Sequence, residues 1–499
     1  MEGAILAVAV AFVASKVEVI YEGILGAIEV EAAAEVLRSY GAVVLISSAA
    51  LLWSRSGDRL AILSRLELRP VQTVVLSFGL AVVTGTLLLS LPVSVTSTDR
   101  VSVFDSFFMA TSAVCVTGLS VVDLGATYSR FGQVVILFLI QAGGLGIMAL
   151  FAAFALIAGR RLSAKNEQEL GEAVGAGQAV GMRRSLRFIV AFTFGFELIG
   201  ILLLLPGLLR LHPEDGVFLS IFHAVSAFTN AGFAVMPGGV QTMGPGALAI
   251  LSCLVVIGGL GAPVLGPIAL LVRRRRKGLG LHAKLALWTT AALLVVGFSG
   301  ILLFESSHSR AGASFLERIG NAAFLSVIAR TAGFDVVGAE ALSPAGAVWM
   351  MLLMLIGASP GSTGGGLKTT TFAVLFLSLV AVLGRRRDVT AFRRTVPQED
   401  VLRAIALVWS GLSILAAGIL LLLATQDLPP FALLFEAFSA FSTTGMSLGV
   451  TGELSASGRL IVMALMFVGR LGPLALLAAF FDRRDKGRIS YPTQHVEFG

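Results

Sequence analysis

The chain has 499 residues, of which 56% are hydrophobic and only 13% are charged. An ordinary soluble domain carries about 25% charged residues, so the composition excludes a soluble globular protein and predicts a polytopic membrane protein. The net charge of +7 would suit a nucleic-acid partner. However, the basic residues cluster at the ends of apolar runs, which predicts a membrane topology and no nucleic-acid binding.

Residues 1–68 are expected to form an N-terminal extension with two short apolar stretches. Glu2 stands where a secretory signal would carry positive charge, so the first stretch is expected to remain in the mature protein. The second stretch, 41–53, would complete a helical pair, whereas the segment between the two could instead lie along the membrane surface. The sequence leaves both arrangements open.

Apolar runs long enough to cross a bilayer recur along the rest of the chain. A membrane-spanning helix needs about 20 apolar residues. Runs of this kind, each expected to span the membrane, are 71–93, 187–209, 246–272, 283–304, 401–424 and 459–481.

Charged residues between these runs predict which side of the membrane each connection faces. The positive-inside rule places the basic clusters in the cytoplasm, namely Arg160 and Arg161, Arg183, Arg184 and Arg187, 273–277, 385–387 with Arg393 and Arg394, and 483–488. The opposite connections carry the acids Asp105, Asp123, Glu214, Asp215, Glu305 and Glu340 and are expected outside. The prediction is a multi-pass protein of the cell inner (plasma) membrane, surrounded by membrane lipid.

Between successive cytoplasmic clusters the chain makes a short, half-apolar excursion, and this happens four times. The excursions, 104–123, 218–237, 315–337 and 431–450, share an aromatic start, a short helical pattern, a small polar pair and a glycine. The glycines recur about every 110 residues, which indicates an internal repeat. The expected fold is all-α, with four pseudo-repeats of helix, re-entrant loop and helix around one ion pathway: repeats 69–165, 181–280, 281–388 and 398–485, then a tail, 486–499.

The excursions are too short and too polar to span the membrane, and non-helical backbone at that depth needs protein or water around it. A short inward helix directs its carbonyl dipoles at the axis and favours a cation there, and the backbone carbonyls that follow can replace the ion's hydration shell. The predicted selectivity filter is Val116, Thr117, Gly118, Asn230, Ala231, Gly232, Thr331, Ala332, Gly333, Thr443, Thr444 and Gly445. In a single loop the same residues would indicate an ordinary helix cap or turn, but four loops in register favour a pore.

The stretch "GASPGSTGGGLKTTT", 357–371, allows three interpretations. It lies near the phosphate-binding pattern, but Leu367 intervenes before Lys368 and no strand precedes it. It also spells G-x-S-x-G around Ser359, although no histidine or acid has an evident place beside that serine. The third interpretation is an interrupted membrane helix whose freed backbone groups border the ion pathway. We favour the third, in which an extended segment below the filter obstructs the ion, over a kink that serves packing alone.

A basic residue also lies within the last span, where a charge costs several kcal/mol (about 2.5 or more) unless it is paired or hydrated. Arg470 would either bond freed carbonyls of the 357–368 loop or form a salt bridge with Glu197 or Glu436. The predicted gating residues are Gly361, Ser362, Thr363, Gly364, Gly365, Gly366, Lys368 and Arg470.

Several motifs together resemble the Ktr/Trk superfamily of potassium uptake proteins over about residues 70–485. They are "CVTGL", "TNAGF", "RTAGF", "STTGM", "IQAGGLGIMAL", "SPGSTGGGLKTTTF" and "MFVGRLGPLALL". The resemblance implies one potassium pathway, usually in a homodimer, an intramembrane gate at the 357–368 loop, and control by a cytosolic ring of nucleotide-binding regulatory subunits. In plant relatives a serine in the first loop accompanies sodium transport, so Gly118 points to potassium as the main ion and leaves sodium as the second candidate.

The resemblance leaves the subfamily open, because the N-terminal extension is closer to Trk-like chains and "KTTT" is Ktr-like. Two other functions are also kept open by the sequence. One is the channel-forming subunit of a potassium-pumping ATPase complex, which uses related loops. The other is an intramembrane serine hydrolase centred on Ser359.

Overall fold

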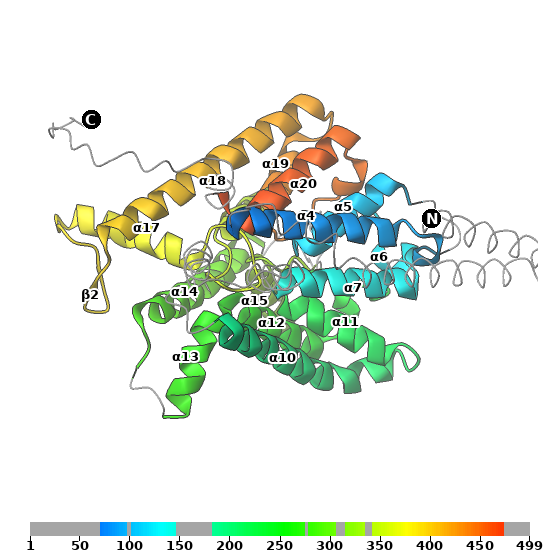
Figure 1. Cartoon of the computed structure of the whole chain (residues 1–499), viewed down its shortest axis with the longest axis horizontal. Coiled ribbons are helices and arrows are strands. Elements are labelled where there is room, and N and C mark those ends of the chain that lie inside the picture. Colours follow the sequence, from blue (N-terminus) through cyan, green and yellow to red (C-terminus); the bar gives the residue numbers. More distant parts are fainter. Residues whose placement is uncertain are drawn as a thin grey trace, which may run out of the picture.

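The computed structural model describes residues 70–96, 101–145, 182–274, 278–305, 315–334 and 342–473, and these residues are largely helical (Figure 1). The extension 1–68, the tail 486–499 and the basic clusters at 160–161 and 483–488 lie outside the described residues. What the sequence suggests for them therefore stays a prediction.

The helices follow one order four times: a long outer helix, a short re-entrant helix and an inner helix. The outer helices are α4 (Pro70–Leu89), α10 (Met182–Leu211), α14 (Leu281–Glu305) and α18 (Gln398–Thr425). The re-entrant helices are α5 (Val103–Val114), α11 (Gly216–Phe228), α15 (Phe315–Ile328) and α19 (Pro430–Ser442). The inner helices are α7 (Arg130–Gly144), α12 (Pro245–Leu260), α16 (Pro344–Leu355) and α20 (Ala456–Leu471).

Smaller elements connect these helices. On one side they are η1 (Pro92–Ser94), α6 (Leu124–Thr127), η2 (Val240–Met243) and η4 (Thr451–Glu453). On the other side, α13 (Ala262–Val272) and α17 (Thr369–Leu383) continue two inner helices. The strands β1 (Thr390–Ala391) and β2 (Arg394–Thr395) pair as an antiparallel hairpin between α17 and α18.

Local sequence explains where the inner helices begin. Ser129, Ser343 and Ser455 each precede an inner helix, and each hydroxyl accepts a hydrogen bond from a backbone N–H of the first turn. Serine is a favoured N-cap because it satisfies a donor that has no partner within the helix. The remaining inner helix, α12, begins instead with Gly244 and a proline at its first position.

Three described helices are long and apolar enough to cross a membrane: Phe188–Leu211, Leu281–Glu305 and Gln398–Thr425. They coincide with the predicted runs 187–209, 283–304 and 401–424, so these predictions are confirmed. Large apolar side chains on the outer helices point away from the protein, among them Leu87, Leu202, Leu303 and Leu420. Such a surface is stable against lipid and not against water.

Two predicted spans are wrong as continuous helices. The run 246–272 is bent by 99° between α12 and α13, at Gly261, whose φ is +72°. The run 459–481 is interrupted after Leu471, because Gly472 has a φ of +89°. Glycine adopts this left-handed conformation without steric penalty, and a hydrophobicity pattern carries no information about φ.

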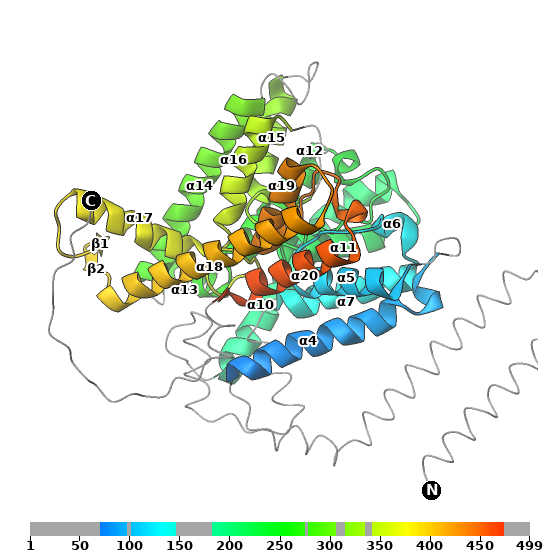
Figure 2. The same cartoon turned by 90° about the horizontal axis from the view of Figure 1, so that it is seen from above.

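The four repeats close into a ring. Each inner helix packs on the re-entrant helix of the next repeat: α7 on α11, α12 on α15, α16 on α19, and α20 on α5. The last contact joins the end of the described chain to its beginning, so α20 lies beside α5 (Figure 2), and the rings of Phe467 on α20 and Phe78 on α4 are 6.4 Å apart. The re-entrant helices are thereby held on the inside of the ring.

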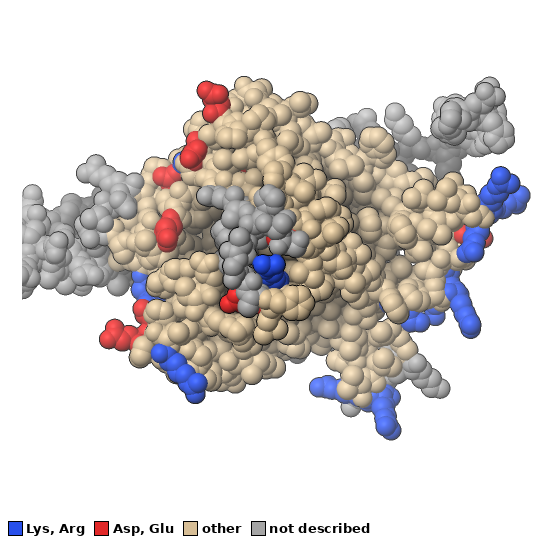
Figure 3. All heavy atoms as spheres, turned by 180° about the vertical axis from the view of Figure 1, so that it is seen from behind, with Lys and Arg blue, Asp and Glu red and all other residues tan. Residues whose placement is uncertain are grey.

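Charge separates along the molecule. Lys and Arg gather mainly at one end in Figure 3, whereas Asp and Glu lie mainly toward the other. The exposed basic residues after α13 and α17 include Arg273, Arg274, Arg385, Arg386 and Arg387. This distribution agrees with the positive-inside topology predicted from the sequence.

Candidate ion pathway

The predicted filter residues follow the four re-entrant helices as short extended segments, here called the glycine segments: 116–118, 230–232, 331–333 and 443–445. In each, the first residue and the glycine have positive φ while the residue between them does not. The first residues are Val116, Asn230, Thr331 and Thr443, with φ values of 56°, 61°, 122° and 51°. A backbone held repeatedly in this sparsely populated region is typical of a functional site.

The glycine segments face one another in a closed order. A Cβ built on Gly118 would overlap the Ala231 carbonyl oxygen, and one on Gly232 would lie 2.7 Å from the Ala332 oxygen. A Cβ on Gly333 would overlap the Thr444 oxygen, and one on Gly445 would overlap the Thr117 oxygen. Each glycine therefore lies against the carbonyl that precedes the glycine of the next repeat, and these contacts run once around the ring. No residue with a side chain fits at these four positions without a shift of the backbone.

Buried hydroxyl groups hold the glycine segments to their own re-entrant helices. The Ser439 hydroxyl accepts a hydrogen bond from the Gly445 N–H at 3.0 Å. The Ser226 hydroxyl donates to the Phe233 carbonyl, just beyond Gly232, at 2.7 Å. Satisfied polar groups of this kind rigidify a buried site.

Sequence reasoning missed a second set of glycines, on the inner helices. A Cβ on Gly143, Gly258 or Gly469 would overlap the carbonyl of Val114, Phe228 or Phe441, respectively, at the end of a re-entrant helix. These glycines let each inner helix pass close to the segment that enters the axis. The signal that could have found them is the repeated pattern G-[GR]-L-G at 143–146, 258–261 and 469–472.

In the third repeat the inner helix is interrupted, as the sequence predicts. It ends at Leu355 and resumes at Thr369. The neck of the intervening loop is closed by backbone hydrogen bonds from Gly357 N–H to the Leu367 carbonyl, 2.8 Å, and from Thr369 N–H to the Ala358 carbonyl, 3.2 Å. The interruption is therefore a defined excursion of the chain and not a frayed helix end.

The tip of this loop lies against the first residues of the glycine segments. The Thr363 hydroxyl donates to the Phe228 carbonyl at 3.2 Å and lies within hydrogen-bonding distance of the Asn230 amide. Gly364 packs on the Thr331 side chain, and Gly365 N–H donates to the Thr443 hydroxyl at 3.1 Å. The loop thus contacts repeats 2, 3 and 4 directly beneath their glycine segments, on the side where the re-entrant helices end.

The bend at Gly261 makes room for the same loop. A Cβ there would lie 2.7 Å from the Ser362 Cα atom, and one on Gly361 would lie 2.7 Å from Pro263. Ser359 N–H also donates to the Gly259 carbonyl at 3.0 Å. The break in repeat 2 and the interruption in repeat 3 are therefore one packed unit.

Three basic side chains bind carbonyls of the loop. Arg470, in the last turn of α20 and 5% exposed, donates to the Thr363 carbonyl and to the Gly143 carbonyl of repeat 1. Lys368 Nζ donates to the Gly364 carbonyl at 2.7 Å. Arg330, which the sequence did not single out, donates to the Gly357 carbonyl at 3.2 Å. Through Arg470 the loop is connected to repeat 1 as well, so that it has contacts with all four repeats.

The alternative partners suggested for Arg470 bind elsewhere. Glu197 accepts a hydrogen bond from Gln141 at 3.3 Å, and Glu436 accepts one from Thr451 at 2.6 Å. The structure thus favours the first of the two arrangements predicted for Arg470, with loop carbonyls as its partners. The Ser359 hydroxyl is fully buried and pairs with the Thr369 hydroxyl at 3.1 Å.

Known proteins match this chain over most of its length. The family model for TrkH, described as cation transport protein, matches residues 37–489. The Ktr system potassium uptake protein B of Bacillus subtilis is 34% identical over 86% of this chain and 97% of its own length. The protein of the same name from Vibrio alginolyticus is 37% identical over 85% of this chain and 94% of its own.

Two further matches extend the comparison. The potassium/sodium uptake protein NtpJ of Enterococcus hirae is 35% identical over 87% of this chain and 98% of its own length. The crystal structure of the potassium transporter TrkH from Vibrio parahaemolyticus superposes with a TM-score of 0.68 at 17% identity, over 90% of this chain and 97% of that one. The structural likeness confirms the all-α polytopic membrane fold.

The family match and the curated relatives cover the ring of helices and the loop described above. Because this family consists of transporters, the hydrolase interpretation of Ser359 is wrong, and the fully buried hydroxyl agrees with that conclusion. The chain therefore belongs to the TrkH family of cation transport proteins, as a multi-pass protein of the plasma membrane and not an enzyme.

Proposed function

We propose that this protein takes up potassium ions through a channel-like pore whose filter is the ring of glycine segments. The observation that carries the proposal is the closed order in which each glycine lies against the carbonyl of the next repeat. Carbonyl oxygens arranged around one axis can replace the hydration shell of a cation without any covalent step. The names of the relatives support potassium as the ion and, through NtpJ, sodium as the second candidate.

The 357–368 loop acts in this proposal as the gate. Its tip lies against glycine segments of repeats 2, 3 and 4, and Arg470 ties it to repeat 1. A segment in that position blocks the exit from the filter on the cytoplasmic side, and withdrawing it opens the path. Gly361, Ser362, Gly364, Gly365 and Gly366 provide a backbone with few side chains, which can move without repacking a core.

Partners are proposed on the resemblance to the Ktr and Trk proteins. The protein works as a homodimer and is controlled by a cytosolic ring of nucleotide-binding subunits. Within the described residues, the exposed basic segment around β1 and β2 faces the cytoplasm and offers such a ring a contact surface. Copurification from the native membrane, with and without the hairpin 390–395, tests this part of the proposal separately from ion transport.

The function itself is tested with purified protein in proteoliposomes. Uptake of labelled potassium should be saturable and should exceed uptake of labelled sodium, while vesicles without protein give the background. Uptake that appears only together with an ATPase subunit would support the alternative of a pump component. Equal uptake of both ions would contradict a potassium filter.

The substitution Gly118→Ser should relax the selectivity toward sodium. The serine Cβ would overlap the Ala231 carbonyl, and Gly118 has a φ of +93°, so one quarter of the ring must shift. Positions with this backbone conformation cost about 1 kcal/mol or more for a residue with a side chain. Reversal potentials measured with potassium on one side and sodium on the other report the change.

A matched control is Gly79→Ser on α4, where a Cβ would meet nothing within 4 Å. This variant should keep the parental ratio of potassium to sodium permeability. If Gly118→Ser also keeps that ratio, Gly118 does not contribute to the filter.

A further inference from the structure

One junction of the ring differs from the other three. Repeats 1 and 2, 2 and 3, and 3 and 4 follow each other along the chain, whereas repeats 4 and 1 meet through non-covalent contacts between α20 and α5. Gly445 lies against the Thr117 carbonyl at this same junction. The spacing of these two glycine segments therefore depends on side chains that bridge the two ends of the chain.

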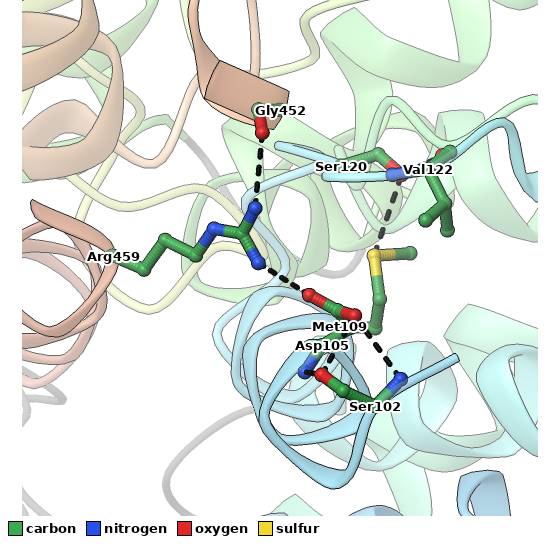
Figure 4. A network of polar contacts seen from close by, with 7 residues as sticks. All are labelled: Ser102, Asp105, Met109, Ser120, Val122, Gly452 and Arg459. Carbon is green, nitrogen blue, oxygen red and sulfur yellow. Dashed lines mark hydrogen bonds and ion pairs between the residues drawn. The ribbon is translucent and has the colours of Figure 1, made fainter. Parts of the chain in front are cut away.

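An ion pair bridges this junction on the extracellular side (Figure 4). Arg459 at the start of α20 binds Asp105 in the first turn of α5, and each side chain is only 19% exposed. The second carboxylate oxygen of Asp105 accepts hydrogen bonds from the Ser102 backbone N–H, 3.1 Å, and from the Ser102 hydroxyl, 2.7 Å. The carboxylate thus also completes a capping box at the positive end of the helix.

Arg459 uses a second nitrogen for the segment that follows Gly445. Its Nη2 atom donates to the Gly452 carbonyl at 2.9 Å (Figure 4). The neighbouring Thr451 hydroxyl donates to Glu436, a fully buried carboxylate on α19, at 2.6 Å. The turn Thr451–Glu453 is therefore fastened both to its own re-entrant helix and to repeat 1.

The corresponding segment of repeat 1 is fastened to α5 in turn. The Ser120 hydroxyl lies 3.3 Å from the Met109 sulfur of α5 (Figure 4), although its closer acceptor is the Val122 carbonyl of its own segment. A Cβ on Gly452 would lie 3.5 Å from the Val121 carbonyl, so the two segments are in contact. The two chains that leave the glycine segments at this junction thus lie side by side, and Arg459 bonds directly to the one from repeat 4.

We propose that Asp105, Arg459, Thr451 and Glu436 form an outer clasp that sets the separation of the glycine segments of repeats 4 and 1. Asp105 and Arg459 are then positioning residues for ion selectivity, although neither touches the ion. The inference rests on the proposed function of the glycine segments as the filter. It adds that the non-covalent junction is the place where the filter widens when support is lost.

A second ion pair provides a matched control. Arg130 of α7 binds Asp215 before α11, again between adjacent repeats, but the side chains are 47% and 56% exposed. The other contacts of Arg130 are with the Phe218 ring, 4.0 Å away, and with Gln133. This pair joins repeats that are already covalently connected and does not fasten a segment that follows a glycine segment.

The test compares Asp105→Asn and Arg459→Gln with Asp215→Asn in proteoliposomes. Because each of the first two variants loses a hydrogen bond between charged groups at the junction, it should lower the potassium-to-sodium permeability ratio about tenfold while transport persists. The control, whose pair is exposed and weak, should change the ratio less than about twofold. An equal loss in all three variants would overturn the proposal, because general destabilisation would then explain it.

Two conservative variants test the outer clasp if Asp105→Asn fails to insert into the membrane. Arg459→Lys keeps the charge near Asp105 but lacks a second nitrogen for the Gly452 carbonyl, and Thr451→Val removes the bond to Glu436 at similar volume. Both should lower the permeability ratio, and Arg459→Lys should do so with little change in thermal stability. Parental ratios in both would overturn the clasp and leave the filter standing, whereas a parent protein without potassium preference would contradict the filter itself.

Discussion

Removal of residues 361–366 is expected to raise the potassium flux by at least about tenfold, because the loop is held under the glycine segments by several hydrogen bonds, some of them from charged donors. The deletion removes the Thr363 and Gly364 carbonyls that Arg470 and Lys368 bind. Residues 358–360 remain to make the turn between Gly357 and Leu367, whose pairing at 2.8 Å closes the neck. The filter keeps its own supports, so the ratio of potassium to sodium permeability should stay near that of the parent.

Rubidium or potassium uptake into proteoliposomes of equal protein content measures this change. Ser362→Ala is a matched control, since it removes one hydrogen bond within the loop, to the Ser359 carbonyl at 2.6 Å, and leaves the loop in place. Its flux should remain close to that of the parent. A deletion variant that inserts normally but conducts at background level would show that the loop serves packing and not gating.

Replacement of Arg470 by alanine should also increase conduction. The guanidinium group bridges the Thr363 carbonyl of the loop and the Gly143 carbonyl of repeat 1 through two different nitrogens. A charged hydrogen bond contributes about 1.5–3 kcal/mol, so losing the loop contact alone favours release of the loop by about tenfold or more. The buried positive charge below the proposed filter, which is expected to lower cation occupancy there, disappears as well.

Arg470→Lys separates the two effects. Lysine keeps the charge but lacks the planar fork that binds two carbonyls at once. If the bridge is what holds the loop, the lysine variant conducts like the alanine variant. If charge alone limits conduction, the lysine variant conducts like the parent. Reduced flux in both, with intact insertion, would contradict a gating role for Arg470.

The positions of the glycine segments and of the interruption at 357–368 could be predicted from the sequence, because they depend on short local patterns. A small polar residue before Gly118, Gly232, Gly333 and Gly445 is visible without any knowledge of packing, and so is the interruption of an apolar run at 357–368. Repetition supplied the decisive information, since one such loop would resemble any helix cap.

Contacts between distant parts of the chain could not be predicted in the same way. Asp105 and Arg459 are 354 positions apart in the sequence. The residues around either one do not identify the other as its partner. Arg330 looked like part of the "RTAG" pattern, and its bond to Gly357 depends on where the next helix ends. The bend at Gly261 cannot be recognised from hydrophobicity, because the helices on its two sides, α12 and α13, are both apolar.

Among the described residues, an inner helix is interrupted by a loop as long as 356–368 in the third repeat alone, and this asymmetry affects how the proposed pore can be modified. Four identical subunits would bring four copies of the 357–368 loop to one axis, where the contacts that Thr363, Gly365 and Arg470 make could be satisfied only once. A single chain with four unequal quarters avoids this crowding. It also means that a substitution at one glycine changes one quarter of the ring and leaves three quarters as they were, so that ion preference can be altered in small steps.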